Sequence, residues 1–176
     1  MRTAIYPGTF DPITNGHLDI AERAGYLFDK LIILVVVNPN KKPIFDVEQR
    51  KALIREAVRP FDHCVIEVDS FQGLTIDYAR RAGAQAMVRG LRVLTDFEWE
   101  LQLALINHKL APEIETVCLM TAQEHSFLSA SIVRELAQHG GRDLGELVPP
   151  HVAAALRAVF GHQAPVGAGA GDRSEM

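Results

Sequence analysis

The chain has 176 residues, which suits one domain with a substantial core, and 48% of them are hydrophobic, which excludes an intrinsically disordered chain. Its 18 basic and 22 acidic residues give a net charge of −4, so it lacks the basic surface of a general nucleic-acid binder, and no apolar run approaches the roughly 20 residues of a membrane-spanning helix. Cys64 and Cys118 lie in apolar stretches without metal-ligand spacing, so we expect buried thiols, no zinc site and a reducing, cytoplasmic setting.

The N-terminal stretch predicts a strand, a tight turn and a helix. An apolar run at residues 3–6 argues against a signal peptide, and the loop after it, residues 7–16, is rich in glycine and proline. Apolar residues then recur at helical spacing, which predicts a helix starting between Thr14 and His17 with Thr14 as its N-cap. The N-terminus of a helix offers free N–H groups and partial positive charge, which suits a phosphate. The turn is neither a Walker loop nor a Gly-x-Gly-x-x-Gly dinucleotide fingerprint.

The rest of the chain alternates apolar runs of strand length with amphipathic stretches of helix length. Further strands are predicted at residues 31–37, 64–68, 86–88 and 115–120, and further helices at 47–59, 74–82, 95–110, 129–138 and 150–160. This order predicts an α/β fold, a Rossmann-like open parallel five-stranded sheet with helices on both faces. It predicts a single domain over residues 1–160 and a flexible C-terminal tail, rich in glycine and alanine, over residues 161–176.

Polar residues follow the carboxyl ends of four predicted strands. They are Thr9, Lys41, Arg89 and the loop from Thr121. Ligands bind along this edge of an open parallel sheet, so we expect these residues to converge on one rim. Arg89 and Arg92 offer forked donors that match phosphate oxygens.

Five stretches of the chain are similar to one known family. Thr14-x-Gly16-His17 resembles the (His/Thr)-x-Gly-His signature of the nucleotidylyltransferase superfamily, and Gly-Thr-Phe-Asp-Pro before it extends the likeness to the bacterial phosphopantetheine adenylyltransferases. The further matching stretches, in the same order as in that family, are residues 40–43, 89–92, 96–100 and 125–134. The resemblance covers about residues 2 to 160.

The resemblance implies transfer of the adenylyl group of ATP to 4′-phosphopantetheine, giving dephospho-coenzyme A and pyrophosphate, with Mg²⁺ accompanying the triphosphate. It also implies a homohexamer and feedback binding of coenzyme A. Two alternatives stay open. One is a sister enzyme with another acceptor, such as nicotinamide mononucleotide or glycerol 3-phosphate, and the other is a catalytically silent sensor of adenine nucleotides on the same fold.

The resemblance also implies the site residues, position by position. Those expected to be catalytic are His17, Lys41 and Arg92. Those expected to bind ATP are Thr9, Phe10, His17, Arg89, Gly90, Leu91, Arg92, Glu100, His125, Ser126, Phe127, Leu128, Ser129, Ala130 and Ser131. Those expected to bind the acceptor are Thr9, Lys41, Thr75, Arg89 and Asn107. No protein ligand to a metal is expected.

The residue types favour direct in-line attack of the acceptor phosphate on the α-phosphate, because no nucleophile with an adjacent base is evident. We expect His17 to stabilise the transition state rather than to act as a base, since the attacking phosphate is already anionic. The resemblance assigns Arg89 to the acceptor's phosphate and Arg92 to the phosphates of ATP. Lys42 is expected to be a surface lysine.

Overall fold

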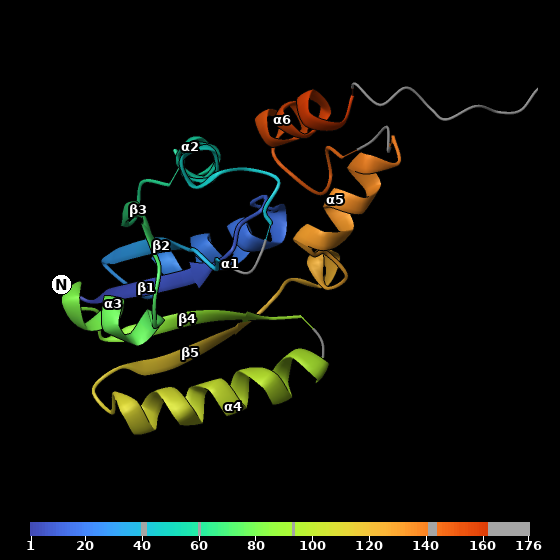
Figure 1. Ribbon diagram of the computed structural model, residues 1–176. Helices are drawn as coiled ribbons and strands as arrows, with labels where there is room; N and C mark the ends of the chain where they lie inside the picture. Colours follow the sequence, from blue (N-terminus) through green and yellow to red (C-terminus); the bar gives the residue numbers. More distant parts are fainter. Residues whose placement is uncertain (40–41, 60, 93, 141–143, 162–176) are drawn as a thin grey trace, which may run out of the picture.

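The computed structural model describes residues 1–39, 42–59, 61–92, 94–140 and 144–161 (Figure 1). Its strands are β1 (Thr3–Gly8), β2 (Lys30–Val36), β3 (Val65–Phe71), β4 (Ala86–Leu91) and β5 (Glu115–Met120). They form one parallel sheet in the order β3-β2-β1-β4-β5. The helices are α1 (Asn15–Gly25), α2 (Val47–Ala57), α3 (Thr75–Arg81), α4 (Leu94–Leu110), α5 (Ala130–Gln138) and α6 (Pro150–Phe160), with a short 3₁₀ helix, η1 (Gln123–His125), before α5. The predicted Rossmann-like fold is confirmed.

Helices cover both faces of the sheet, because alternate residues of the central strands point to opposite sides. On one face, Ala4 and Tyr6 belong to a core that includes buried residues of α1, α5 and α6. On the other face, Ile5 packs with Ile76 and Ala79 of α3. Figure 1 shows α4 across the sheet from α5 and α6.

The strand order places the site. From β1 the chain runs outward to β2 and β3 on one side and then crosses to β4 and β5 on the other. A crevice opens at such a switch point, outside the carboxyl ends of the strands that flank it. The loop after β1 and the end of β4 therefore face the same space.

Two strands extend further than the sequence predicts. Pro7 and Gly8 pair with β2 in parallel register, and Arg89 pairs with Cys118 of β5. Arg89 therefore lies within β4, whereas the sequence predicts that it follows the strand. Proline, glycine and arginine have no strand preference of their own, but the neighbouring strands determine where these strands end.

The prediction of two buried thiols is wrong. Cys118 is exposed on β5, and Cys64 is half-buried just before β3. These strands form the two edges of the sheet, where an apolar run has fewer neighbours to cover it. Both thiols are free.

The described chain ends just after α6, at Gly161. The rest of the predicted tail, residues 162–176, lies outside the described residues. Of the helices within the described ranges, none is long and apolar enough to cross a membrane.

Candidate active site

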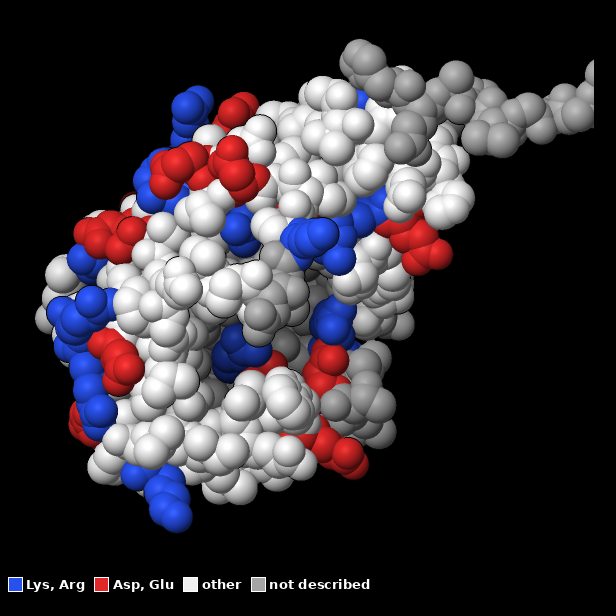
Figure 2. All heavy atoms as spheres, in the orientation of Figure 1, with Lys and Arg blue, Asp and Glu red and all other residues white. Residues whose placement is uncertain are grey.

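A cleft of about 580 Å³ opens at the carboxyl ends of β1 and β4. It is bordered by the β1–α1 loop, the end of β4, the start of α4 and the N-terminus of α5. Figure 2 shows this hollow, with lysine and arginine atoms gathered inside it and around its rim. A smaller pocket of about 230 Å³ adjoins it and shares Thr75, Arg89, Glu100 and Leu103 with the cleft.

The β1–α1 loop has a tightly fixed backbone. Phe10 is 2% exposed and adopts a left-handed φ of 48°, which is uncommon for a bulky residue. Its ring lies over Gly8, where an added Cβ would come within 2.8 Å of the Phe10 ring. Only glycine leaves room for the ring at this position.

Thr14 and His17 cap the first turn of α1 reciprocally. The backbone N–H of His17 donates to Thr14 Oγ1, and the backbone N–H of Thr14 donates to His17 Nδ1 at 3.1 Å. Because Nδ1 accepts a bond, the neutral ring carries its proton on Nε2. The predicted N-cap is confirmed, and the cap also sets the tautomer of His17.

The imidazole of His17 is neutral at physiological pH. Burial, together with the positive charge of Arg92, lowers the pKa of His17 to about 4. The ring lies edge-on to Phe10, with 5.1 Å between ring centroids, and borders the cleft. His17 can therefore offer a neutral N–H donor, but it is held below the pKa range of a general base for neutral pH.

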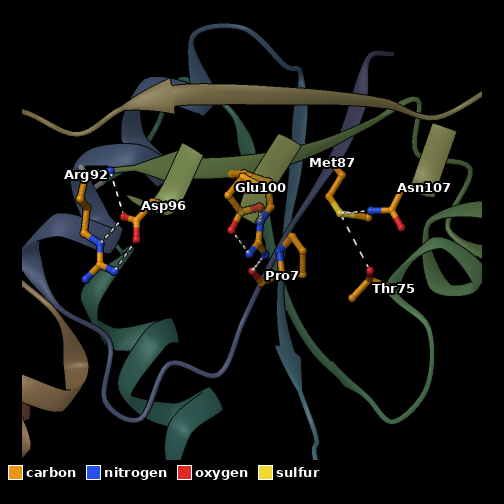
Figure 3. A network of polar contacts seen from close by, with 8 residues as sticks. Pro7, Thr75, Met87, Arg92, Asp96, Glu100 and Asn107 are labelled. Atoms are coloured by element: carbon orange, nitrogen blue, oxygen red, sulfur yellow. Dashed lines mark hydrogen bonds and ion pairs between the residues drawn. The ribbon is translucent and has the colours of Figure 1, made fainter. Parts of the chain in front are cut away.

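Arg89 is held between the two cavities. Its Nε and Nη2 atoms donate to the two carboxylate oxygens of Glu100 at 2.7 and 2.5 Å, and its Nη1 donates to the carbonyl of Pro7 at 3.0 Å. Figure 3 shows Glu100 and Pro7 in the centre, with Arg92 and Asp96 on one side. On the other side, Thr75 and Asn107 lie around the sulfur of Met87, at 3.9 and 4.0 Å.

Arg92 links the start of α4 to the segment before α5. It forms an ion pair with Asp96, with 3.0 Å between Nε and Oδ2, and its Nη1 donates to the carbonyl of Leu128 at 3.2 Å. Ser129 caps α5 by accepting from the backbone N–H of Ile132. The cleft is therefore faced by two helix N-termini, those of α1 and α5, and by three arginines, Arg89, Arg92 and Arg134, which together suit a polyanionic ligand.

Sequence comparisons agree with this geometry. The cytidylyltransferase-like family matches residues 5–136. A phosphopantetheine adenylyltransferase from Synechococcus sp. (strain JA-3-3Ab) is 57% identical over 157 residues, which cover 89% of this chain and 97% of the relative. Another from Alkaliphilus metalliredigens is 52% identical over 156 residues, covering 89% and 98%. The chain belongs to the phosphopantetheine adenylyltransferase family.

Solved structures of more distant proteins share the fold alone. A bifunctional NMN adenylyltransferase/ADP ribose pyrophosphatase from Francisella tularensis aligns with a TM-score of 0.68 at 16% identity, covering 91% of this chain and 51% of that one. A nicotinic acid mononucleotide adenylyltransferase from Plasmodium falciparum gives 0.64 at 12% identity, covering 91% and 96%. The phosphopantetheine adenylyltransferase assignment therefore depends on the curated relatives and not on these neighbours.

Most residues expected from the family resemblance lie around the cleft of this family member. Those that border it are Thr9, Phe10, His17, Thr75, Arg89, Gly90, Arg92, Glu100, Leu128, Ser129, Ala130 and Ser131. Asn107 borders the smaller pocket. Lys41 lies outside the described residues, whereas Lys42, expected to be a surface lysine, is exposed and also borders the cleft. The roles of all these residues stay predictions.

Four expected contacts do not border the cleft. Leu91 is 5% exposed and belongs to the core. His125 packs near Gly16, Ser126 donates to the carbonyl of Gln123, and Phe127 is 63% exposed. His125 lies in the 3₁₀ turn of η1, and Ser126 is its C-cap.

The structure adds polar residues, in the site or in contact with it, that sequence reasoning did not place there. Asp11 accepts from two backbone N–H groups after β2, and Arg134 donates to the carbonyl of Asp11 at 2.7 Å. Asp96 pairs with Arg92, and Arg50 donates to the carbonyl of Thr9. Asp11 and Arg134 belong to the two signature stretches, which could have indicated them, but Arg50 lies in neither.

The carboxylates of the cleft do not fit a protein-held metal ion. Asp11, Asp96 and Glu100 each already accept hydrogen bonds from protein groups. Within the described ranges no three His, Cys, Asp or Glu side chains gather as metal ligands would. That no residue of the chain binds a metal directly stays a prediction.

Proposed function

We propose that this chain transfers the adenylyl group of ATP to 4′-phosphopantetheine, giving dephospho-coenzyme A and pyrophosphate. The observation that carries the proposal is the convergence of His17, Arg89, Arg92 and the N-termini of α1 and α5 on one cleft. Relatives with 52% and 57% identity are named for this activity.

The reaction proceeds by direct displacement. An oxygen of the acceptor phosphate forms a bond to the α-phosphorus of ATP, the bond from that phosphorus to the β-phosphate oxygen breaks, and pyrophosphate leaves with the electron pair. The acceptor oxygen is already ionised, so no proton has to be removed. The protein contributes alignment and stabilisation of the charge that develops at phosphorus.

Each half of the site has its own task. The neutral Nε2–H of His17 donates to an α-phosphate oxygen, next to the free N–H groups of α1. Arg92 and the N-terminus of α5 bind the outgoing phosphates. The smaller pocket, lined in part by Leu74, Leu103 and Met87, holds the acceptor's arm, and Arg89 binds the acceptor's phosphate between the two cavities.

Magnesium enters as part of the substrate, bound to the ATP triphosphate. Coenzyme A carries the same arm as the acceptor, so feedback binding would use the same smaller pocket. The two free thiols suit a cytoplasmic location.

A homohexamer is also part of the proposal. Trp99, Leu105 and Ile106 on α4 are 61%, 63% and 55% exposed, and a cluster of exposed apolar side chains is typical of an interaction surface. Sedimentation of the full chain measures its mass in solution, and a monomer would contradict this part.

The direct test of function is pyrophosphate release with ATP and a panel of acceptors. We expect release with 4′-phosphopantetheine and little with nicotinamide mononucleotide or glycerol 3-phosphate. Release with another acceptor alone would make the chain a sister enzyme, and ATP binding without any release would make it a nucleotide sensor.

A further inference from the structure

Arg50 of α2 is buried where an arginine is costly. Arg50 is 3% exposed, yet no carboxylate among the described residues forms an ion pair with it. Its Nη1 donates to the carbonyl of Thr9 at 2.9 Å, and its Nε donates to the carbonyl of Asp46 at 3.3 Å. A buried guanidinium needs such partners to offset its lost hydration. Its contact with Thr9 links α2 directly to the cleft, which Thr9 borders.

Arg50 is one of two arginines that hold the β1–α1 loop around its strained residue. Phe10 has a φ of 48°, a conformation that persists only when the surrounding structure enforces it. The carbonyl before Phe10, of Thr9, accepts from Arg50, and the carbonyl of Asp11 after it accepts from Arg134 of α5. Two helices that are distant in the sequence therefore hold the backbone on both sides of Phe10.

The loop and the start of α2 contact each other through side chains of both segments. The carboxylate of Asp11, 3% exposed, accepts from the backbone N–H groups of Ile44 and Phe45 at 2.9 and 3.0 Å. Asp46 then caps α2, which carries Arg50 back toward Thr9. The loop and the start of α2 are thus linked by side chains from each partner.

We propose that Arg50 is a positioning residue for the phosphates of the nucleotide. It does not border the cleft itself. By holding the carbonyl of Thr9, it fixes the loop that leads into α1, so that Thr9 and the first turn of α1 face the phosphates in one geometry. The inference rests on the proposed function only in taking the cleft as the nucleotide site.

The test compares ATP with adenosine, which lacks the phosphates. Arg50→Met keeps the apolar stem and removes every donor. We expect it to raise the dissociation constant for ATP by about tenfold or more and that for adenosine by less than about twofold, in calorimetry at a temperature at which the variant is folded. Arg55→Met is the matched control. Arg55 lies on the same helix, donates to the carbonyl of Val68 and does not border the cleft, so both constants should stay unchanged.

Arg50→Lys separates position from charge. A lysine keeps the positive charge but cannot supply two separate N–H donors from fixed positions, so it should lose most of the ATP affinity that Arg50→Met loses. It also decides the question if Arg50→Met does not fold. ATP affinity within about twofold of the wild type in Arg50→Lys would show that only the charge matters and would overturn the proposal.

Two further outcomes would also overturn it. One is an equal loss of ATP and adenosine affinity, because that would mean general distortion, and the other is an unchanged ATP affinity in folded Arg50→Met. These measurements do not depend on the acceptor. A wild-type chain that releases no pyrophosphate with 4′-phosphopantetheine would contradict the proposed function and leave the Arg50 test standing.

Discussion

The protonation of His17 is set by its immediate neighbours. Thr14 donates a backbone N–H to Nδ1, and burial and Arg92 lower the pKa of the ring to about 4. At neutral pH the side chain is therefore an uncharged donor in a fixed tautomer. This is the form that can donate to an anionic phosphate without having lost or gained a proton beforehand.

The lowered pKa of His17 predicts a loss of stability on acidification. In the unfolded chain the ring takes up a proton near pH 6.5, whereas in the folded chain it stays neutral down to about pH 4. The contribution of this pKa shift to the stability of the fold is therefore complete above pH 6.5 and is lost progressively as the pH falls toward 4. Between pH 7 and pH 5 the free energy of unfolding should decrease more for the wild type than for His17→Ala, by up to about 2 kcal/mol, and thermal melts at both pH values measure this difference. Equal decreases in the two proteins would show that the pKa of His17 is not lowered in the folded chain.

Gly8 is predicted to be intolerant of a side chain. Gly8→Ala would place a methyl group 2.8 Å from the buried ring of Phe10 and should lower the free energy of unfolding by about 1–3 kcal/mol. Gly16→Ala is the control, because its nearest contact would be an ordinary 3.4 Å to His125. Denaturant melts of both variants measure the difference. Similar stabilities would show that the ring of Phe10 can move aside.

At the scale of elements, the end of β4 and the start of α4 act together. Arg89 from the strand pairs with Glu100 from the helix, and Arg92 between the two elements pairs with Asp96. Each arginine is thus oriented by a carboxylate of the same helix. The remaining donors of each guanidinium are available for ligands.

The two arginines should affect different substrates. Arg89→Ala should mainly weaken binding of 4′-phosphopantetheine, and Arg92→Ala should mainly weaken binding of ATP, each by about tenfold or more. Lysine at either position should not restore full affinity, because a point charge lacks the bidentate fork. Calorimetry with each substrate measures both effects. If Arg89→Ala and Arg92→Ala weakened only ATP, the assignment of Arg89 would be wrong.

The elements were predictable from the sequence where local pattern decides them. The apolar run at β2 and the caps Thr14, Asp46 and Ser129 could be predicted because each depends on residues close in sequence. The extension of β4 through Arg89 could not, because pairing with β5 sets it. The buried position of Arg50 could not be predicted either, since its partner Thr9 lies 41 residues away.

At the scale of the whole molecule, the sheet's switch point gathers the site from residues spread over more than half of the chain. His17, Arg89 and Ser131 border one cleft because β1 and β4 are neighbours in the sheet. The general location could be predicted, because ligands bind at this edge of parallel sheets. The division into two cavities with Arg89 between them could not, since it depends on how α4 packs.

The C-terminal tail is predicted to be dispensable. α6 ends at Phe160, and Pro150–Phe160 supplies the buried Val152, Ala153 and Leu156. A chain truncated after Gly161 should keep both its melting temperature and its rate of pyrophosphate release, because residues 162–176 carry no apolar periodicity. A large decrease in melting temperature would show that the tail docks on the protein or on a neighbouring subunit.

The measurement that tests the account most directly is the turnover of His17→Ala with ATP and 4′-phosphopantetheine, alongside thermal melting and ATP calorimetry. The account predicts a folded protein with nearly normal ATP affinity and a kcat lowered by about 10²–10³, the usual cost of losing one transition-state donor. His151→Ala is the control, because this half-buried histidine of α6 contacts the carbonyl of Leu53 away from the cleft and should leave kcat unchanged. A well-folded His17→Ala protein with near-normal kcat would contradict the account.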